Sequence, residues 1–179
     1  MNQIFNFPNI LSIARIFLAY PIIYFLGKNE TINAVWLILI AIFTDYFDGY
    51  FSRKNKEVTE FGKFIDPVAD KICVISILLF LFFQNKIELY YFLIIFTRDF
   101  VIMIGGLHLK IKKGFIIKSN WVGKVTVFFT SIYILLVVLN FGLENNFVKI
   151  IYYTNILYLF YSLFLYIKRY FEVLRGELV

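Results

Sequence analysis

Long apolar stretches alternate with short polar links along the whole chain of 179 residues. A helix that crosses a bilayer needs about 20 apolar residues, or a few more when it tilts. Six stretches come close to this length, so the pattern predicts an all-α polytopic membrane protein with six transmembrane helices. The expected spans are residues 10–27, 32–52, 66–84, 89–109, 119–140 and 147–168.

The links between these spans are short, and no flexible linker or internal repeat interrupts the pattern. We therefore expect residues 1–179 to form a single integral-membrane domain. Composition supports this interpretation, because 61% of the residues are hydrophobic and 21% are aromatic, well above the average for soluble domains.

The formal net charge of +6 raises the question of a nucleic-acid partner. We expect no such partner, because the basic residues lie between apolar spans and not in a soluble domain. Positive charge beside a span instead indicates orientation and contact with anionic membrane lipids. The single cysteine, Cys73, excludes a disulfide within the chain.

Lysine and arginine are distributed unevenly over alternate links. Cytoplasmic links carry the excess of these residues in membrane proteins. Eleven basic residues lie in the second link, the fourth link and the C-terminal tail, against three in the other links, which places both termini on the cytoplasmic side. The eleven are Arg53, Lys54, Lys56, Lys63, Lys110, Lys112, Lys113, Lys118, Lys168, Arg169 and Arg175, and the three are Lys28, Lys86 and Lys149.

Six of the 12 acidic residues fall in the stretch DYFDGYFSRKNKEVTEFGKFIDPVADK, residues 45–71, and four of the six are aspartates. Asp45 and Asp48 are separated by about 60° around a helix, and Asp66 and Asp70 by about 40°. Asp66 precedes Pro67, a pair typical of an N-cap followed by proline at the first helical position. The two pairs are therefore expected to face each other across a hairpin.

Four converging carboxylates repel one another and are unfavourable at membrane depth unless a cation neutralises them. The segment 45–71 contains no histidine or cysteine. Oxygen ligands alone favour Mg²⁺, Mn²⁺ or Ca²⁺ over zinc. The alternative is that the aspartates are solvated helix caps paired with Arg53, Lys63 and Lys71.

This stretch resembles the signature of the CDP-alcohol phosphatidyltransferases. The pattern is D-x-x-D-G-x-x-A-R, eight or nine residues, then G-x-x-x-D-x-x-x-D. One position departs from it, since Ser52 stands where the pattern has alanine, and a small residue is kept there. The matching residues are Asp45, Asp48, Gly49, Arg53, Gly62, Asp66 and Asp70.

The resemblance implies a six-helix membrane enzyme that transfers a phosphatidyl group from CDP-diacylglycerol to an alcohol and releases CMP. It implies that the four aspartates hold one or two Mg²⁺ or Mn²⁺ ions and that Asp70 is also the general base. It further implies a homodimer. We expect the protein in a bacterial cytoplasmic membrane, and the distribution of lysine and arginine places the active site on the cytoplasmic side. The expected CDP-binding residues are Asp45, Asp48, Gly49, Ser52, Arg53 and Gly62.

A small phosphorylated alcohol is expected to bind the basic residues around spans four and five. By resemblance these are Arg98, Lys118, Ser119 and Lys124. Two of these residues have an alternative interpretation. Lys118 is also typical of a lysine in a cytoplasmic link, and Arg98 could form a structural ion pair with Asp99 instead of binding the acceptor. Arg15, within the first span, is expected to point inward, because an unpaired arginine facing lipid is unfavourable.

The motif defines the reaction class better than the acceptor. Glycerol-3-phosphate is favoured, because the chain is short and carries the basic set around spans four and five. Phosphatidylglycerol and an inositol phosphate remain alternatives. A non-enzymatic alternative is an ion transporter, but transporter acids usually lie near the bilayer midplane on broken helices, often within repeats.

Overall fold

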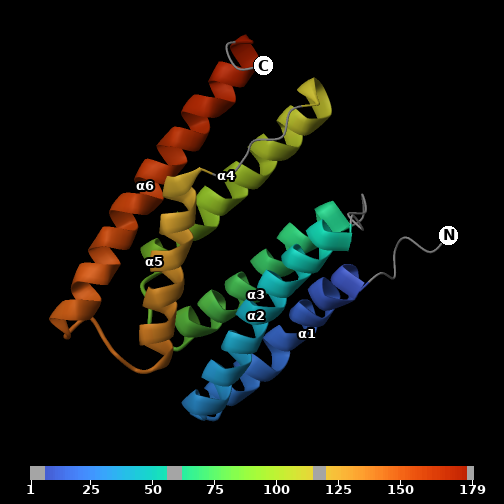
Figure 1. The fold of residues 1–179 in the computed structure, drawn as a ribbon. Coiled ribbons are helices and arrows are strands. Elements are labelled where there is room, and N and C mark those ends of the chain that lie inside the picture. The colour runs from blue at the N-terminus through green and yellow to red at the C-terminus, as the bar shows by residue number, and fades with distance from the viewer. Residues whose placement is uncertain (1–6, 56–61, 115–119, 177–179) are drawn as a thin grey trace. The chain divides into compact units, whose positions relative to one another are not determined.

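The structure is a computed structural model that describes the backbone of residues 7–55, 62–114 and 120–176. It describes the side chains of these ranges except at 7–9, 11, 45–55, 62–67 and 70. The described part contains six α-helices and no strand, which confirms the predicted all-α class. The helices are α1 (Phe7–Gly27), α2 (Thr31–Asn55), α3 (Gly62–Phe83), α4 (Leu89–Lys113), α5 (Trp121–Val138) and α6 (Asn146–Arg175) (Figure 1).

Three of these helices, α4, α5 and α6, are long and apolar enough to cross a membrane. The described apolar runs of the other three are shorter. Large apolar side chains also cover the outside of the helices: Phe17 is 73% exposed and Leu157 71%. Such a surface is unfavourable in water and favourable in lipid. The chain is thus a polytopic membrane protein, and the full number of six spans stays a prediction.

Two glycines end the helices α4 and α6. Gly114 (φ 64°) and Gly176 (φ 78°) adopt the left-handed conformation that closes a helix. Both helices run past their expected spans, and α6 continues from the expected end at residue 168 to Arg175. The difference arises because hydropathy marks the lipid-embedded part, whereas backbone hydrogen bonding continues through the polar residues that follow.

The described chain divides into two compact units, residues 1–84 and 85–179. In the first, α1 packs against both α2 and α3. Its buried positions recur at intervals of three and four residues, which is the spacing of one narrow helical face. On α2 the buried residues Ala34 and Ala41 are small and permit close approach. Among the described side chains of α1, the buried ones are Ser12, Arg15, Ala19, Ile22 and Leu26.

In the second unit, α6 packs against both α4 and α5. Asn155 of α6, fully buried, connects the three helices. Its Oδ1 accepts a hydrogen bond from the Tyr91 hydroxyl of α4 at 2.8 Å. Its Nδ2 donates to the carbonyl of Thr126 at 3.2 Å and to Oγ1 of Thr130 at 3.0 Å, both on α5. This network connects the three helices of the second unit.

Candidate active site

The four motif aspartates lie on two helices that both pack against α1. Asp45 and Asp48 lie in the C-terminal half of α2, and Asp66 and Asp70 in the first turns of α3. Their side chains are outside the described residues. Metal coordination by the four carboxylates therefore stays a prediction, as does the role of Asp70 as the general base.

The predicted start of α3 is wrong. The helix begins at Gly62, so Asp66 is not its N-cap and Pro67 lies inside the helix. A proline at this sixth helical position lacks the N–H that would otherwise bond to the carbonyl of residue 63 in the first turn. As a consequence, positions 62, 66 and 70 follow one another at one-turn intervals on a single helix.

The first half of the motif is also helical throughout, because α2 continues to Asn55. Positions 45, 48, 49, 52 and 53 recur at intervals of three and four residues and therefore share one helical face. Binding of CDP by Gly49, Ser52, Arg53 and Gly62 remains a prediction, because their side chains also lie outside the described residues.

Arg15 is buried in the first unit. It is 2% exposed and lies on the same face of α1 as Ser12, which is 0% exposed. This burial confirms the predicted inward orientation of Arg15. A guanidinium at membrane depth is stabilised only by polar partners inside the protein.

Arg98 of α4 is buried in the second unit, where it is 6% exposed. Its Nη1 lies 2.6 Å from Oδ1 of Asp99, an ion pair, and its Nη2 donates to Oγ of Ser162 on α6 at 2.8 Å. The pairing with Asp99 that was considered for this residue is therefore present. It does not consume the donors of the guanidinium, which carries five N–H groups.

The first turn of α5 lies close to α6. Asn120 caps α5 by accepting a hydrogen bond from the backbone N–H of Gly123 at 2.6 Å. A side chain on Gly123 would meet the hydroxyl of Tyr166 on α6 at 3.0 Å, so glycine permits the close approach. Lys124 follows and is exposed. Lys118 and Ser119, the other predicted acceptor residues, lie outside the described residues.

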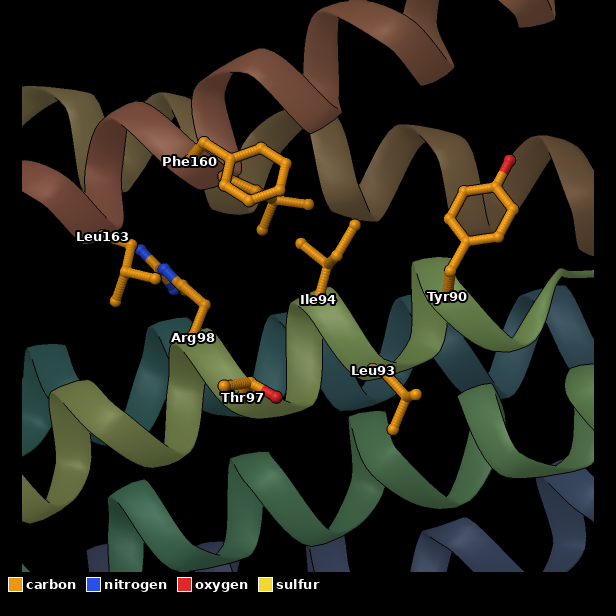
Figure 2. Close-up of a pocket in the computed structure, with 8 residues that line it drawn as sticks. Tyr90, Leu93, Ile94, Thr97, Arg98, Phe160 and Leu163 are labelled. Atoms are coloured by element: carbon orange, nitrogen blue, oxygen red, sulfur yellow. The ribbon is translucent and has the colours of Figure 1, made fainter.

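Arg98 lies at one end of a hollow of about 290 Å³ between α4 and α6, and Tyr90 lies at the other (Figure 2). The lining is mostly apolar, and it suits a hydrocarbon chain better than a small polar molecule. The lining residues are Tyr90, Leu93, Ile94, Thr97, Arg98, Leu159, Phe160 and Leu163.

Sequence reasoning missed the partners of Arg98 on α6. Ser162 and Tyr166 stand in an apolar, aromatic helix, where a serine or a tyrosine attracts no notice. One signal was available: an arginine inside a span requires a polar partner on another helix. That rule predicts that a partner exists, and it leaves the position of the partner open.

Comparison with known proteins gives the family. A family model described as CDP-alcohol phosphatidyltransferase matches residues 5–167. A CDP-diacylglycerol–glycerol-3-phosphate 3-phosphatidyltransferase of Aquifex aeolicus is 34% identical over 154 residues, which cover 85% of each chain.

Two further relatives carry the same name. The protein of Bacillus subtilis is 33% identical over 138 residues, 68% of this chain and 70% of the relative. The protein of Mycoplasma pneumoniae is 34% identical over 139 residues, 65% of this chain and 60% of the relative. Because the family match spans most of the sequence, the chain belongs to the CDP-alcohol phosphatidyltransferase family.

Proposed function

We propose that this protein transfers the phosphatidyl group of CDP-diacylglycerol to glycerol-3-phosphate, which makes it a phosphatidylglycerophosphate synthase. The observation that carries the proposal is the similarity to the Aquifex aeolicus enzyme of that activity, which extends over 85% of both chains. The aspartate motif on α2 and α3 supports it, since the reaction requires groups that neutralise a diphosphate.

The donor set on α2 and α3 fits one or two Mg²⁺ or Mn²⁺ ions. All four candidate ligands are carboxylates, and within each helix they stand about one turn apart. Such an ion, when bound, neutralises charge on the diphosphate of the donor. The proposed ligands are Asp45, Asp48, Asp66 and Asp70.

The residues of the chain perform the remaining steps. Asp70 accepts the proton of the acceptor hydroxyl, whose oxygen forms a bond to the phosphorus of the phosphatidyl group. The bond between that phosphorus and the bridging oxygen of CMP breaks, and CMP leaves with the electron pair. Arg53 binds a phosphate of the donor, and Gly49 and Gly62 allow the nucleotide to approach the backbone.

The acceptor phosphate is bound by basic residues of α4 and α5. Arg98 offers a planar set of donors that suits a phosphate, and Lys124 adds an exposed charge in the first turn of α5. Lys118 and Ser119 complete the proposed set. The N-terminus of α5 contributes a favourable dipole for an anion.

We further infer that the protein acts in a bacterial cytoplasmic membrane, as a homodimer, with both termini and the active site on the cytoplasmic side. The distribution of lysine and arginine over alternate links supports this orientation. A cytoplasmic site suits a donor with lipid tails and a water-soluble head, and an acceptor that is dissolved in water.

A second candidate is a cardiolipin synthase, which uses phosphatidylglycerol as the acceptor. The apolar hollow beside Arg98 favours it, because an acyl chain fits such a lining next to a phosphate-binding cation. The three relatives described above, by their names, act on glycerol-3-phosphate, which favours the first candidate. An inositol phosphate acceptor has no comparable support.

A two-substrate assay with product identification separates these candidates. The purified protein is given CDP-diacylglycerol with glycerol-3-phosphate, phosphatidylglycerol or inositol phosphate, and the lipid product is identified by mass spectrometry. We expect phosphatidylglycerophosphate and an equal amount of CMP with the first acceptor. The Asp70→Asn variant is the control and should form no product. Cardiolipin as the main product would replace the first candidate with the second.

A further inference from the structure

The guanidinium of Arg98 has spare hydrogen-bonding capacity although it is paired. Asp99 and Ser162 accept from one nitrogen each. Its Nε is buried and has no hydrogen-bond partner among the described residues. A guanidinium carries five N–H donors, so the bonds to Asp99 and Ser162 leave part of the fork for an anion. The ion pair with Asp99 therefore does not exclude an acceptor phosphate.

Ser162 determines the direction in which this fork points. Asp99 is the neighbour of Arg98 on α4, so a bond to Asp99 holds the Arg98 side chain against its own helix and not against another. Ser162 lies on α6, is 0% exposed, and accepts from Nη2 at 2.8 Å. Asp99 on α4 accepts from Nη1 and Ser162 on α6 accepts from Nη2. Because the two acceptors lie on different helices, together they restrict rotation of the guanidinium.

Tyr166 connects Arg98 to the first turn of α5. It follows Ser162 by one helical turn on α6, and its ring centroid lies 5.9 Å from Cζ of Arg98, within cation–π range. At its other end, the hydroxyl lies 3.0 Å from the place where a Cβ on Gly123 would stand. Gly123 directly precedes Lys124, so one tyrosine contacts both Arg98 and the helical turn that carries Lys124.

We propose that Ser162 and Tyr166 of α6 are positioning residues of the acceptor-phosphate site. Ser162 orients the guanidinium of Arg98, and Tyr166 sets its distance from the first turn of α5. The inference rests on the proposed function, in which Arg98 and Lys124 bind the phosphate of the acceptor. It assigns to α6 a part in acceptor recognition through residues that do not themselves touch the substrate.

A purely structural role makes a different prediction. If Ser162 and Tyr166 only fill the interface between helices, their loss lowers thermal stability and affects both substrates alike. A positioning role instead raises the KM for the acceptor and leaves the KM for CDP-diacylglycerol nearly unchanged, because the donor does not bind Arg98. The separation of the two KM values is therefore the decisive readout.

The test uses the full chain in lipid nanodiscs, after the product of the wild-type reaction has been identified. The Ser162→Ala and Tyr166→Leu variants should each raise the KM for glycerol-3-phosphate about fivefold or more, the loss expected when a charge-assisted contact is weakened. Ser162→Thr, which keeps a hydroxyl, and Tyr166→Phe, which keeps the ring, should each recover most of that loss.

Thr130→Val is the matched control. It also removes a hydroxyl that is hydrogen-bonded between α5 and α6, but the partner is Asn155 and not Arg98. Both KM values of this variant should stay within about twofold of wild type, well below the fivefold change expected of the Ser162→Ala variant.

The outcomes separate the inference from the proposed function. Should Ser162→Ala and Tyr166→Leu leave the acceptor KM unchanged, or raise both KM values equally, the positioning role is wrong and the proposed function stands. Should the wild-type protein make no product from glycerol-3-phosphate, the proposed function fails first, and the positioning role of Ser162 and Tyr166 fails with it.

Discussion

At the scale of single residues, Arg98 shows how a charge is kept inside a membrane protein. The side chain is 6% exposed, and burial of an unpaired cation at this depth is unfavourable. Asp99 supplies the counter-charge and Ser162 a neutral acceptor. The same contacts that make the burial tolerable also fix the geometry of the donors.

The Arg98→Lys variant tests that geometry at constant charge. A lysine has a single side-chain nitrogen, whereas arginine binds Asp99 and Ser162 through two. The ammonium group therefore cannot keep both contacts and also present the planar set of donors that binds a phosphate. The KM for glycerol-3-phosphate should rise about tenfold, equivalent to one hydrogen bond, and the KM for CDP-diacylglycerol should change little. Steady-state kinetics with each substrate varied in turn measures both.

Lys168→Ala is the control for this variant. Lys168 is an exposed cation of α6 that pairs with Glu172 at 3.8 Å and not with Asp99. An exposed pair of this kind contributes little, so both KM values should match wild type. An equal effect of the two substitutions on the acceptor KM would mean that net charge, not the geometry at Arg98, governs acceptor binding.

Removal of divalent cations tests the proposed role of the aspartates. Four clustered carboxylates with no softer ligand in the segment call for an oxygen-binding ion. Activity should be lost in EDTA and return when Mg²⁺ or Mn²⁺ is added in excess, whereas Zn²⁺ should restore little. Circular dichroism serves as the control for folding, and full activity of the folded protein in EDTA would overturn the metal hypothesis.

At the scale of helices, polar residues hold the second unit together. In a bilayer, apolar contacts between helices are not favoured over contacts with lipid, so hydrogen bonds and close packing contribute more of the specificity. Asn155 bonds to Tyr91 on α4 and to Thr126 and Thr130 on α5. The rings of Tyr91 and Tyr133 pack beside it at 4.7 Å between centroids.

The Asn155→Leu variant tests this network. It keeps a similar volume but leaves the Tyr91 hydroxyl without its acceptor, at a cost of about 1–2 kcal/mol in the free energy of unfolding. The thermal midpoint followed by circular dichroism should fall. Leu157→Ala, on the lipid-facing side of the same helix and 71% exposed, is the control and should change it much less. Equal shifts would indicate that the network does not stabilise the unit.

At the scale of the whole molecule, the distribution of lysine and arginine predicts which side of the membrane each link faces. Eleven lysines and arginines lie in one set of links and the tail, and three lie in the other links. Because cytoplasmic links carry the excess, residue 112 should face the cytoplasm and residue 86 the opposite side.

Cysteine labelling measures this orientation. In sealed vesicles whose cytoplasmic face points inward, an impermeant thiol reagent added outside should label a Lys86→Cys variant. It should leave Lys54→Cys and Lys112→Cys unlabelled. The native Cys73 is buried and gives a low background. Labelling of position 54 from outside would reverse the orientation and move the proposed site to the other face.

The sequence by itself determined the features that depend on local chemistry. Hydropathy located the six helices that the structure describes, since lipid exposure requires runs of apolar side chains. The spacing of the four aspartates placed each pair on one helical face, because helical periodicity relates neighbours in the chain, and the same stretch resembled the family signature. The start of α3 was misjudged, since Asp-Pro is only a local signal and the backbone upstream of it was already helical.

Only the tertiary structure decided which distant residues meet. Ser162 lies 64 positions from Arg98, and Tyr91 lies 64 positions from Asn155. Periodicity places each on the inner face of its helix, but the pairing depends on how far α4 slides along α6 and how α6 turns about its axis. Many registers bury the same apolar area, so packing and hydrogen bonding between helices select the one in which Ser162 meets Arg98.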